Sequence, residues 1–130
     1  MIETLAGKTA FITGGGGGIG AGIAAAFAEQ GMRVVLADRN PDFAREAAAE
    51  IGAAALALEL DVTQPESWSA ARAAAEVWCG PIDVLVNNAG VQVVDNFVDT
   101  NLADAERMLR LNLLAPLRMT KAVLPKMIEQ

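Results

Sequence analysis

Five consecutive glycines, residues 14–18, are the feature of this sequence with the most specific chemical use. They follow the short apolar segment 9–12. After them come Ile19, Ile23 and Phe27, whose spacing of four places them on one face of a helix. Glycine allows positive φ angles and leaves no Cβ between backbone and ligand, and the helix start offers unpaired N–H groups at the positive end of its dipole. We expect this strand, turn and helix to bind a pyrophosphate group.

The spacing of the glycines separates two kinds of phosphate-binding turn. A P-loop needs the pattern Gly-x-x-x-x-Gly-Lys-Ser/Thr, and no lysine lies near this turn. Hydrolysis of a nucleoside triphosphate is therefore disfavoured. The pattern present, Thr13-Gly14-x-x-x-Gly18-Ile19-Gly20, is a variant of the fingerprint that binds dinucleotides. The alternatives are a flexible linker or a tight turn without a ligand.

Asp38 is the candidate ligand of a cofactor ribose. It ends the apolar segment 32–37, which is too short and too rich in β-branched residues for a helix. It lies 18 positions after Gly20 (38 − 20), close to the spacing of the acid that accepts ribose hydroxyls in dinucleotide-binding folds. A carboxylate there repels the 2′-phosphate of NADP, so NAD is the predicted cofactor. The alternative is that Asp38 only starts a turn before Asn40-Pro41.

Five features, in this order, resemble the short-chain dehydrogenase/reductase family. They extend along nearly the whole chain and are the glycine turn, Asp38, Asp61-Val62, Asn87-Asn88-Ala89-Gly90 and Asn112. The resemblance implies an oxidoreductase that transfers hydride between a nicotinamide cofactor and a small-molecule alcohol or ketone. The identity of the substrate stays open, because the only part of the family's substrate pocket expected here is the apolar loop 91–100.

The resemblance also implies a cofactor site. The glycine turn would hold the pyrophosphate, Asp38 the adenosine ribose, Asp61-Val62 the adenine and residues 88–90 the inner ribose. In this family a basic residue before the second motif glycine, or directly after the second strand, marks NADP use. Gly17 does not meet the first pattern and Arg39 partly meets the second, so use of both cofactors stays open. The predicted cofactor-binding residues are Gly14, Gly17, Gly18, Ile19, Gly20, Asp38, Arg39, Asp61, Val62, Asn88, Ala89 and Gly90.

Two of these predictions have ordinary structural alternatives. An acid such as Asp61 is common at the end of a strand, and the Asn and Gly residues of segment 87–90 also favour turns. Thr63, which follows, is expected to be structural, because Thr63-Gln64-Pro65-Glu66 matches a capping box.

Asn112 is the candidate catalytic residue. It interrupts the apolar stretch 111–114, and a buried amide without a partner costs about 1–3 kcal/mol, so we expect it to be hydrogen-bonded. The resemblance implies that this asparagine orders a water molecule that connects an active-site lysine to solvent. The alternative is a core asparagine whose hydrogen bonds serve the fold alone.

The residues that would carry out hydride transfer by the family's mechanism are missing from this sequence. The family uses a serine and a Tyr-x-x-x-Lys pair, and the chain has no tyrosine. Lys121 and Lys126 are preceded four positions earlier by Leu117 and Ala122. We therefore expect residues 1–130 to be the NAD-binding part of one Rossmann domain whose catalytic half is absent, and the segment to be inactive alone. A second hypothesis is a truncated, non-catalytic NAD-binding module that acts through a partner chain.

The elements that position these residues follow from periodicity and from turn residues. Strands are predicted over residues 8–13, 32–37, 53–60 and 82–86, and helices over 18–30, 41–51, from Thr63 to about 79, and 101–128 with a bend at Pro116. The predicted fold is α/β: an incomplete, doubly wound, Rossmann-like parallel sheet of order 3-2-1-4, with helices on both faces. The fourth strand would then be an unprotected edge. The long helix after Asn101 is the kind of surface that this family uses to form dimers or tetramers.

Composition excludes several other classes of protein. The net charge of −6 offers no basic surface for nucleic acid, and the absence of histidine argues against zinc sites and Ser-His-Asp triads. Cys79 is the single cysteine and is expected to be a buried or half-buried small residue. No signal pattern or 18-residue apolar stretch is present, so we expect a cytoplasmic protein that does not bind membranes.

Overall fold

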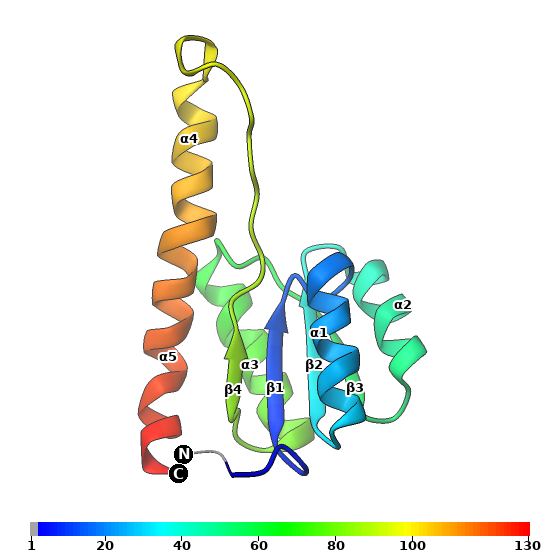
Figure 1. Cartoon of the computed structure of the whole chain (residues 1–130). Helices are drawn as coiled ribbons and strands as arrows, with labels where there is room; N and C mark the ends of the chain where they lie inside the picture. The colour runs from blue at the N-terminus through cyan, green and yellow to red at the C-terminus, as the bar shows by residue number, and fades with distance from the viewer. Residues whose placement is uncertain (1–2) are drawn as a thin grey trace.

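A computed structural model describes residues 3–130; the first two residues, which the domain prediction includes, lie outside it. Four parallel strands form one sheet in the order β3-β2-β1-β4, with helices on both faces, as predicted (Figure 1). The elements are β1 Thr9–Thr13, α1 Gly18–Glu29, β2 Arg33–Asp38, α2 Pro41–Ile51, β3 Ala55–Glu59, α3 Pro65–Cys79, β4 Val84–Val86, the 3₁₀ turn η1 Phe97–Asp99, α4 Leu102–Leu109, the π-helical turn η2 Arg110–Leu114 and α5 Ala115–Glu129.

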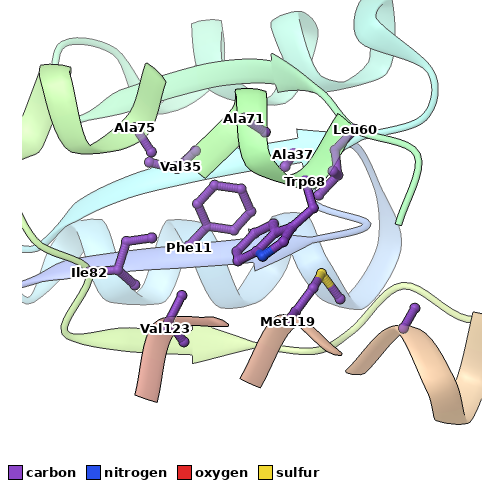
Figure 2. Packing of buried hydrophobic residues seen from close by; sticks show 11 residues of the cluster. Phe11, Val35, Ala37, Leu60, Trp68, Ala71, Ala75, Ile82, Met119 and Val123 are labelled. Atoms are coloured by element: carbon purple, nitrogen blue, oxygen red, sulfur yellow. The ribbon is translucent and has the colours of Figure 1, made fainter. Parts of the chain in front are cut away.

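Alternate residues of β1 and β2 face two separate hydrophobic cores. On one side, Ala10 and Ile12 pack with Ala24 of α1 and Ala48 of α2. On the other side, Phe11 packs with residues of α3 and α5 (Figure 2). Both strands are therefore covered on each face, which explains why they are continuous apolar runs in the sequence.

Trp68 of α3 is the largest side chain in the second core. It is 6% exposed, and its ring meets that of Phe11 edge-on, with centroids 5.0 Å apart (Figure 2). Ala71 and Ala75 follow on the same helix face and are buried as well. This face of α3 therefore serves core packing.

The three apolar residues expected on one face of α1 differ in exposure. Ile23 and Phe27 pack against the first core, as expected, but Ile19, in the first turn of the helix, is 75% exposed. Gly20 and Ala24 are the buried positions of α1. A Cβ on Gly20 would lie 2.2 Å from the carbonyl oxygen of Gly14, so this face of α1 lies directly against the turn.

The capping box predicted at Thr63 is wrong. Helix α3 begins at Pro65, its N-cap residue is Gln64, and no side chain caps it. The Thr63 hydroxyl donates instead to Oδ1 of Asp61 at 2.6 Å. The threonine is structural, as predicted, but it shapes the turn before the helix rather than the helix end.

The long helix predicted over 101–128 deviates near Pro116, as expected. Helix α4 passes through the π-helical turn η2 into α5, and the three form one column that rises beyond the carboxyl ends of the strands (Figure 1). Pro116 is the second residue of α5 and has no N–H to donate to the carbonyl of Asn112, four positions earlier. Such a local loss of the regular ladder favours a wider π turn.

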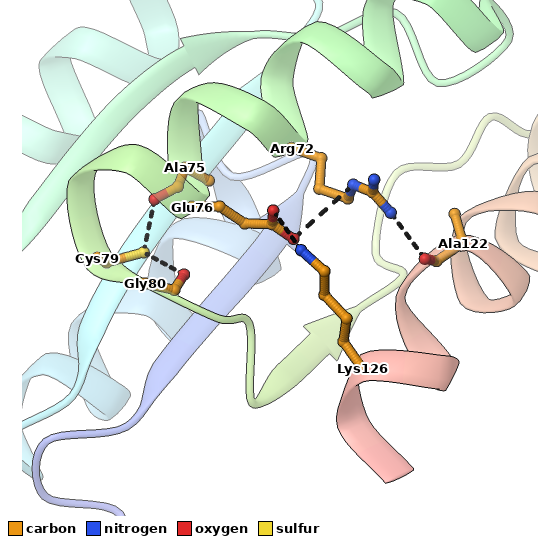
Figure 3. A network of polar contacts seen from close by, with 7 residues as sticks. All are labelled: Arg72, Ala75, Glu76, Cys79, Gly80, Ala122 and Lys126. Carbon is orange, nitrogen blue, oxygen red and sulfur yellow. Dashed lines mark hydrogen bonds and ion pairs between the residues drawn. The ribbon is translucent and has the colours of Figure 1, made fainter. Parts of the chain in front are cut away.

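Helix α5 is attached to α3 by a polar network as well as by the core (Figure 3). Nη1 of Arg72 donates to the carbonyl oxygen of Ala122 at 2.7 Å, and Nζ of Lys126 lies 2.8 Å from Oε2 of Glu76 (Figure 3). Cys79, at the end of α3, is half-buried, as predicted, and its thiol donates to the carbonyl of Ala75.

Strand β4 is the edge of the sheet and is shorter than predicted. It begins at Val84. Just before it, the N–H of Asp83 donates to the carbonyl of Thr9 at 3.0 Å, and the carboxylate of Asp83 accepts the N–H of Thr9 at 2.9 Å. Among residues 3–130, β4 pairs only with β1. Within the same residues, no helix combines the length and the apolar character needed to cross a bilayer.

Candidate cofactor-binding site

The glycine turn connects β1 to α1 at the carboxyl edge of the sheet. Gly14 and Gly18 have φ angles of +63° and +54°, which side chains rarely tolerate. A Cβ on Gly17 or Gly18 would meet nothing within 4 Å, so this side of the turn is open. Gly17 is the N-cap of α1 and no side chain caps the helix. The first N–H groups of α1 are thus free of side-chain partners and suit an anion.

Asn88 and Thr13 fix the inner side of the turn. Nδ2 of Asn88 donates to the carbonyl oxygens of Thr13 and Gly14, at 3.0 and 3.1 Å. The Thr13 hydroxyl accepts the N–H groups of Asn88 and Ala89, both at 3.0 Å, and lies 3.3 Å from the carbonyl oxygen of Val86. Segment 88–90 is therefore held rigidly beside the turn. Sequence analysis gave Thr13 no role, although it is the first residue of the glycine motif.

Asp38, at the end of β2, accepts a hydrogen bond from the glycine turn and also lines the cleft. Its Oδ2 accepts the N–H of Gly16 at 3.0 Å, and its Oδ1 accepts the N–H of Asn40 at 2.9 Å. The side chain is half-buried and lines the cleft described below. Asp38 therefore does bond to the turn at Asn40-Pro41, as the alternative interpretation expected. The same side chain also lines the cleft where a ribose could lie.

Asp61 is held ionised by its own neighbours. Its Oδ1 accepts both the hydroxyl of Thr63, at 2.6 Å, and the N–H of Thr63, at 3.0 Å. The Thr63 hydroxyl is the main cause that lowers the pKa of Asp61; partial burial opposes it, and the Thr63 N–H and the charge of Arg39 add to the lowering. The negative charge of Asp61 therefore persists to lower pH than that of an ordinary aspartate.

Most of the predicted cofactor residues surround one cleft of about 490 Å³. The predicted residues in its wall are Gly14, Asp38, Arg39, Asp61, Val62, Asn88, Ala89 and Gly90. The remaining four predicted residues, Gly17, Gly18, Ile19 and Gly20, do not line it. Sequence analysis missed the other lining residues, which are Leu60, Thr63, Val91, Arg107 and Leu111.

Asn112 is exposed, so the expectation of a buried amide is wrong. It is nevertheless hydrogen-bonded at both ends of its amide: its Oδ1 accepts the N–H of Val91 at 2.9 Å, and its Nδ2 donates to the carbonyl of Val91 at 2.7 Å. This reciprocal pair joins η2 to the segment that follows Gly90. The side chain of Asn112 therefore has a clear positioning role, and its predicted part in catalysis stays a prediction.

The fold and this cleft define a Rossmann-type nucleotide-binding protein. A model of the short chain dehydrogenase family matches residues 8–130, so the chain belongs to that family. It is 39% identical to a 2,5-dichloro-2,5-cyclohexadiene-1,4-diol dehydrogenase, LinX, of Sphingobium indicum, with 99% of this chain and 53% of that protein aligned. It is 43% identical to a sorbitol dehydrogenase of Cereibacter sphaeroides, with 95% and 48% aligned. The chain spans about half the length of the curated relatives it matches.

Solved structures give the same result for the fold. The crystal structure of a 3-ketoacyl-(acyl-carrier-protein) reductase from Brucella melitensis complexed with NADH superposes with a TM-score of 0.90 at 38% identity, over 94% of this chain and 51% of that one. A putative short-chain dehydrogenase from Novosphingobium aromaticivorans gives 0.92 at 31% identity, over 98% and 48%. Both superpositions cover nearly the whole of this chain.

Proposed function

We propose that this chain is the NAD-binding part of an oxidoreductase that transfers hydride between a nicotinamide cofactor and an alcohol or ketone. The observation that carries the proposal is the position of Asp38. Its carboxylate lines the cleft at the carboxyl end of β2, and the N–H groups of Gly16 and Asn40 orient it. In doubly wound sheets, ligands bind at this edge, where the strand order reverses.

The residues present fit a dinucleotide. The open side of the turn at Gly17 and Gly18, together with the uncapped start of α1, suits the pyrophosphate. Asp38 would accept the adenosine ribose hydroxyls, and residues 88–90 would lie beside the inner ribose. When bound, the nicotinamide ring supplies the hydride chemistry, and the protein contributes orientation and charge.

The charges around the cleft favour NAD over NADP. Asp38 would repel a 2′-phosphate at the position of the ribose hydroxyls. Arg39 stands next to it, but its charge already acts on the carboxylate of Asp61. The 3-ketoacyl-(acyl-carrier-protein) reductase structure that resembles this chain was solved with NADH.

Hydride transfer by the whole protein would need catalytic residues that these 130 residues lack. The 130 residues contain no tyrosine, so a Tyr-x-x-x-Lys pair would have to lie outside this sequence. Within the chain, Asn112 would contribute by holding Val91 next to the inner ribose site. The alternative of a non-catalytic module finds no support in the relatives, which are named as dehydrogenases, reductases and oxidoreductases.

Association and location are proposed on less specific grounds. Exposed leucines along α4, η2 and α5 suit a homodimer or homotetramer; they include Leu102, Leu109, Leu113, Leu117 and Leu124. A cytoplasmic location would suit an enzyme that uses a soluble nicotinamide cofactor. Sedimentation equilibrium of the protein would test the proposed association.

Titration of NADH and NADPH into wild type and an Asp38→Ala variant tests the proposal. A hydrogen bond to a charged group contributes about 1.5–3 kcal/mol, so NADH should bind about 10- to 150-fold more weakly to the variant. NADPH should lose much less affinity, because the repulsive charge is removed too. Asp99→Ala removes the same charge from an exposed site outside the cleft and should leave both affinities unchanged. Equal affinities for NADH in wild type and Asp38→Ala would refute the proposed ribose site.

A further inference from the structure

We propose that Arg107 closes the adenine end of the cleft by stacking its guanidinium on the adenine ring of the bound dinucleotide. The inference rests on the proposed function and adds to it a recognition residue from α4. Arg107 lies in the last turn of α4 and lines the cleft. The chain leaves the cleft after Val91 and returns to it only at Arg107.

The cleft that Arg107 lines has the chemistry for a heterocyclic base. Its apolar lining residues include Leu60 and Val62, which follow β3, and Leu111 of η2. Asp61 stands between Leu60 and Val62 in the chain, and its Oδ1 accepts two hydrogen bonds from Thr63. We place the purine ring against these apolar residues, with one π face left for Arg107.

Arg107 is free to cover that face. The ion pairs within residues 3–130 are Lys8–Asp83, Arg45–Asp42 and the pairs of Glu76 with Arg72 and Lys126, and Arg107 takes part in none. Its side chain is exposed and also lines a second hollow of about 380 Å³ that adjoins the cleft at Thr63. The guanidinium therefore has room to move onto a ligand without first breaking an ion pair.

Hydrogen bonds fix the base of this arm, and its end is exposed. The reciprocal hydrogen bonds of Asn112 with Val91 hold η2, directly after α4, against the end of the cleft. Leu111 and Arg107 are four positions apart, and both face the cleft. A planar cation on a fixed helix suits stacking on an aromatic ring better than the ammonium of a lysine would.

The test uses three probes: NADH, ADP-ribose, which lacks the nicotinamide, and reduced nicotinamide mononucleotide, which lacks the adenosine. Arg107→Ala should weaken the binding of NADH and of ADP-ribose by the same factor, about 2- to 30-fold for a cation–π contact. Binding of the mononucleotide should not change. Arg118→Ala, an exposed arginine of α5 outside the cleft, is the matched control and should leave all three unchanged.

Three results would overturn the inference. Equal weakening of the mononucleotide by Arg107→Ala would show that the residue does not act on the adenosine half. Wild-type affinity in Arg107→Lys would indicate a point-charge contact with a phosphate rather than stacking. If Asp38→Ala weakens NADH binding while Arg107→Ala does not, the stacking inference fails alone. If the wild-type protein binds no NADH at all, the proposed function itself fails.

Discussion

Replacement of Gly20 by alanine should distort the nucleotide turn, and a second glycine of the same helix provides the control. A Cβ on Gly20 would lie 2.2 Å from the carbonyl oxygen of Gly14 and 2.6 Å from Nδ2 of Asn88. Both atoms belong to the packed inner side of the turn, so neither can move away as a flexible chain end would. A Cβ on Gly22, two residues further along α1, would meet nothing within 4 Å.

The expected magnitude follows from the difference between the two variants. Alanine in place of glycine within a helix gains about 0.5–1 kcal/mol, so Gly22→Ala should be more stable than wild type by about that amount. Gly20→Ala shares most of this gain but adds an overpacking cost of about 1–3 kcal/mol and loses a hydrogen bond of Asn88 with a net contribution of about 1 kcal/mol. The free energy of unfolding of Gly20→Ala should therefore be about 2–4 kcal/mol below that of Gly22→Ala.

Urea denaturation followed by circular dichroism measures this difference directly. NADH titration of the two folded variants adds a functional measurement, because a shifted turn should bind the pyrophosphate less well while Gly22→Ala should bind normally. If Gly20→Ala were as stable as Gly22→Ala and bound NADH equally well, the close contact between α1 and the turn would not constrain the site as we infer.

Three further variants probe the contacts around the cleft and the α3–α5 junction. Asn112→Ala removes both hydrogen bonds to Val91 and should lower the free energy of unfolding by about 1–3 kcal/mol, with faster exchange of the Val91 amide hydrogen; unchanged exchange would contradict the pairing. Thr63→Val removes the main cause of the lowered pKa of Asp61. A lowered folded-state pKa stabilises the wild-type protein at pH values above 3.8, the ordinary pKa, and this stabilisation is lost as the pH falls through the folded-state pKa. Thr63→Val should therefore be less stable than wild type at pH 7 and should lose less stability on acidification. Parallel profiles of stability against pH for variant and wild type would argue against this. Arg72→Met keeps the aliphatic stem but loses the bond to the α5 carbonyl, and it should cost about 1–2 kcal/mol in urea denaturation, whereas no loss would mean that this hydrogen bond does not help to hold α5.

Local sequence signals were sufficient for the order of the elements and for much of the site. The glycine spacing, the apolar segment that ends at Asp38 and the small residues of 88–90 each report on a few neighbouring positions. Because the strands are parallel, their carboxyl ends meet at one edge, and the predicted residues meet there too. The family resemblance supplied their assignment to parts of a dinucleotide.

Features that depend on contacts between distant segments could not be predicted. Gly20 fits directly against Gly14, and Ile19 beside it is exposed although Ile23 and Phe27, which share its helical spacing, pack on the core. Thr63 matches a capping pattern in the sequence, but its hydroxyl donates to Asp61 and does not cap the helix. Arg107 reaches the cleft only because the chain returns to the sheet edge at the end of α4, and no local sequence pattern predicts this return.

The pairing of the strands also predicts an order of folding. Thr9 of β1 pairs with Arg33 of β2, and Val34 pairs with Ala55, so the first three strands assemble through short loops. Ala10 must find Val84 across a loop roughly three times as long, which costs about 1 kcal/mol more in closure entropy and slows the search. Strand β4 and the helices after it should therefore dock last and open first. Residues 88–91, which line the cleft, follow β4 and belong to the part of the domain that docks last. A dinucleotide bound in the cleft would contact both this part and the first three strands, and would therefore stabilise the docking of one on the other.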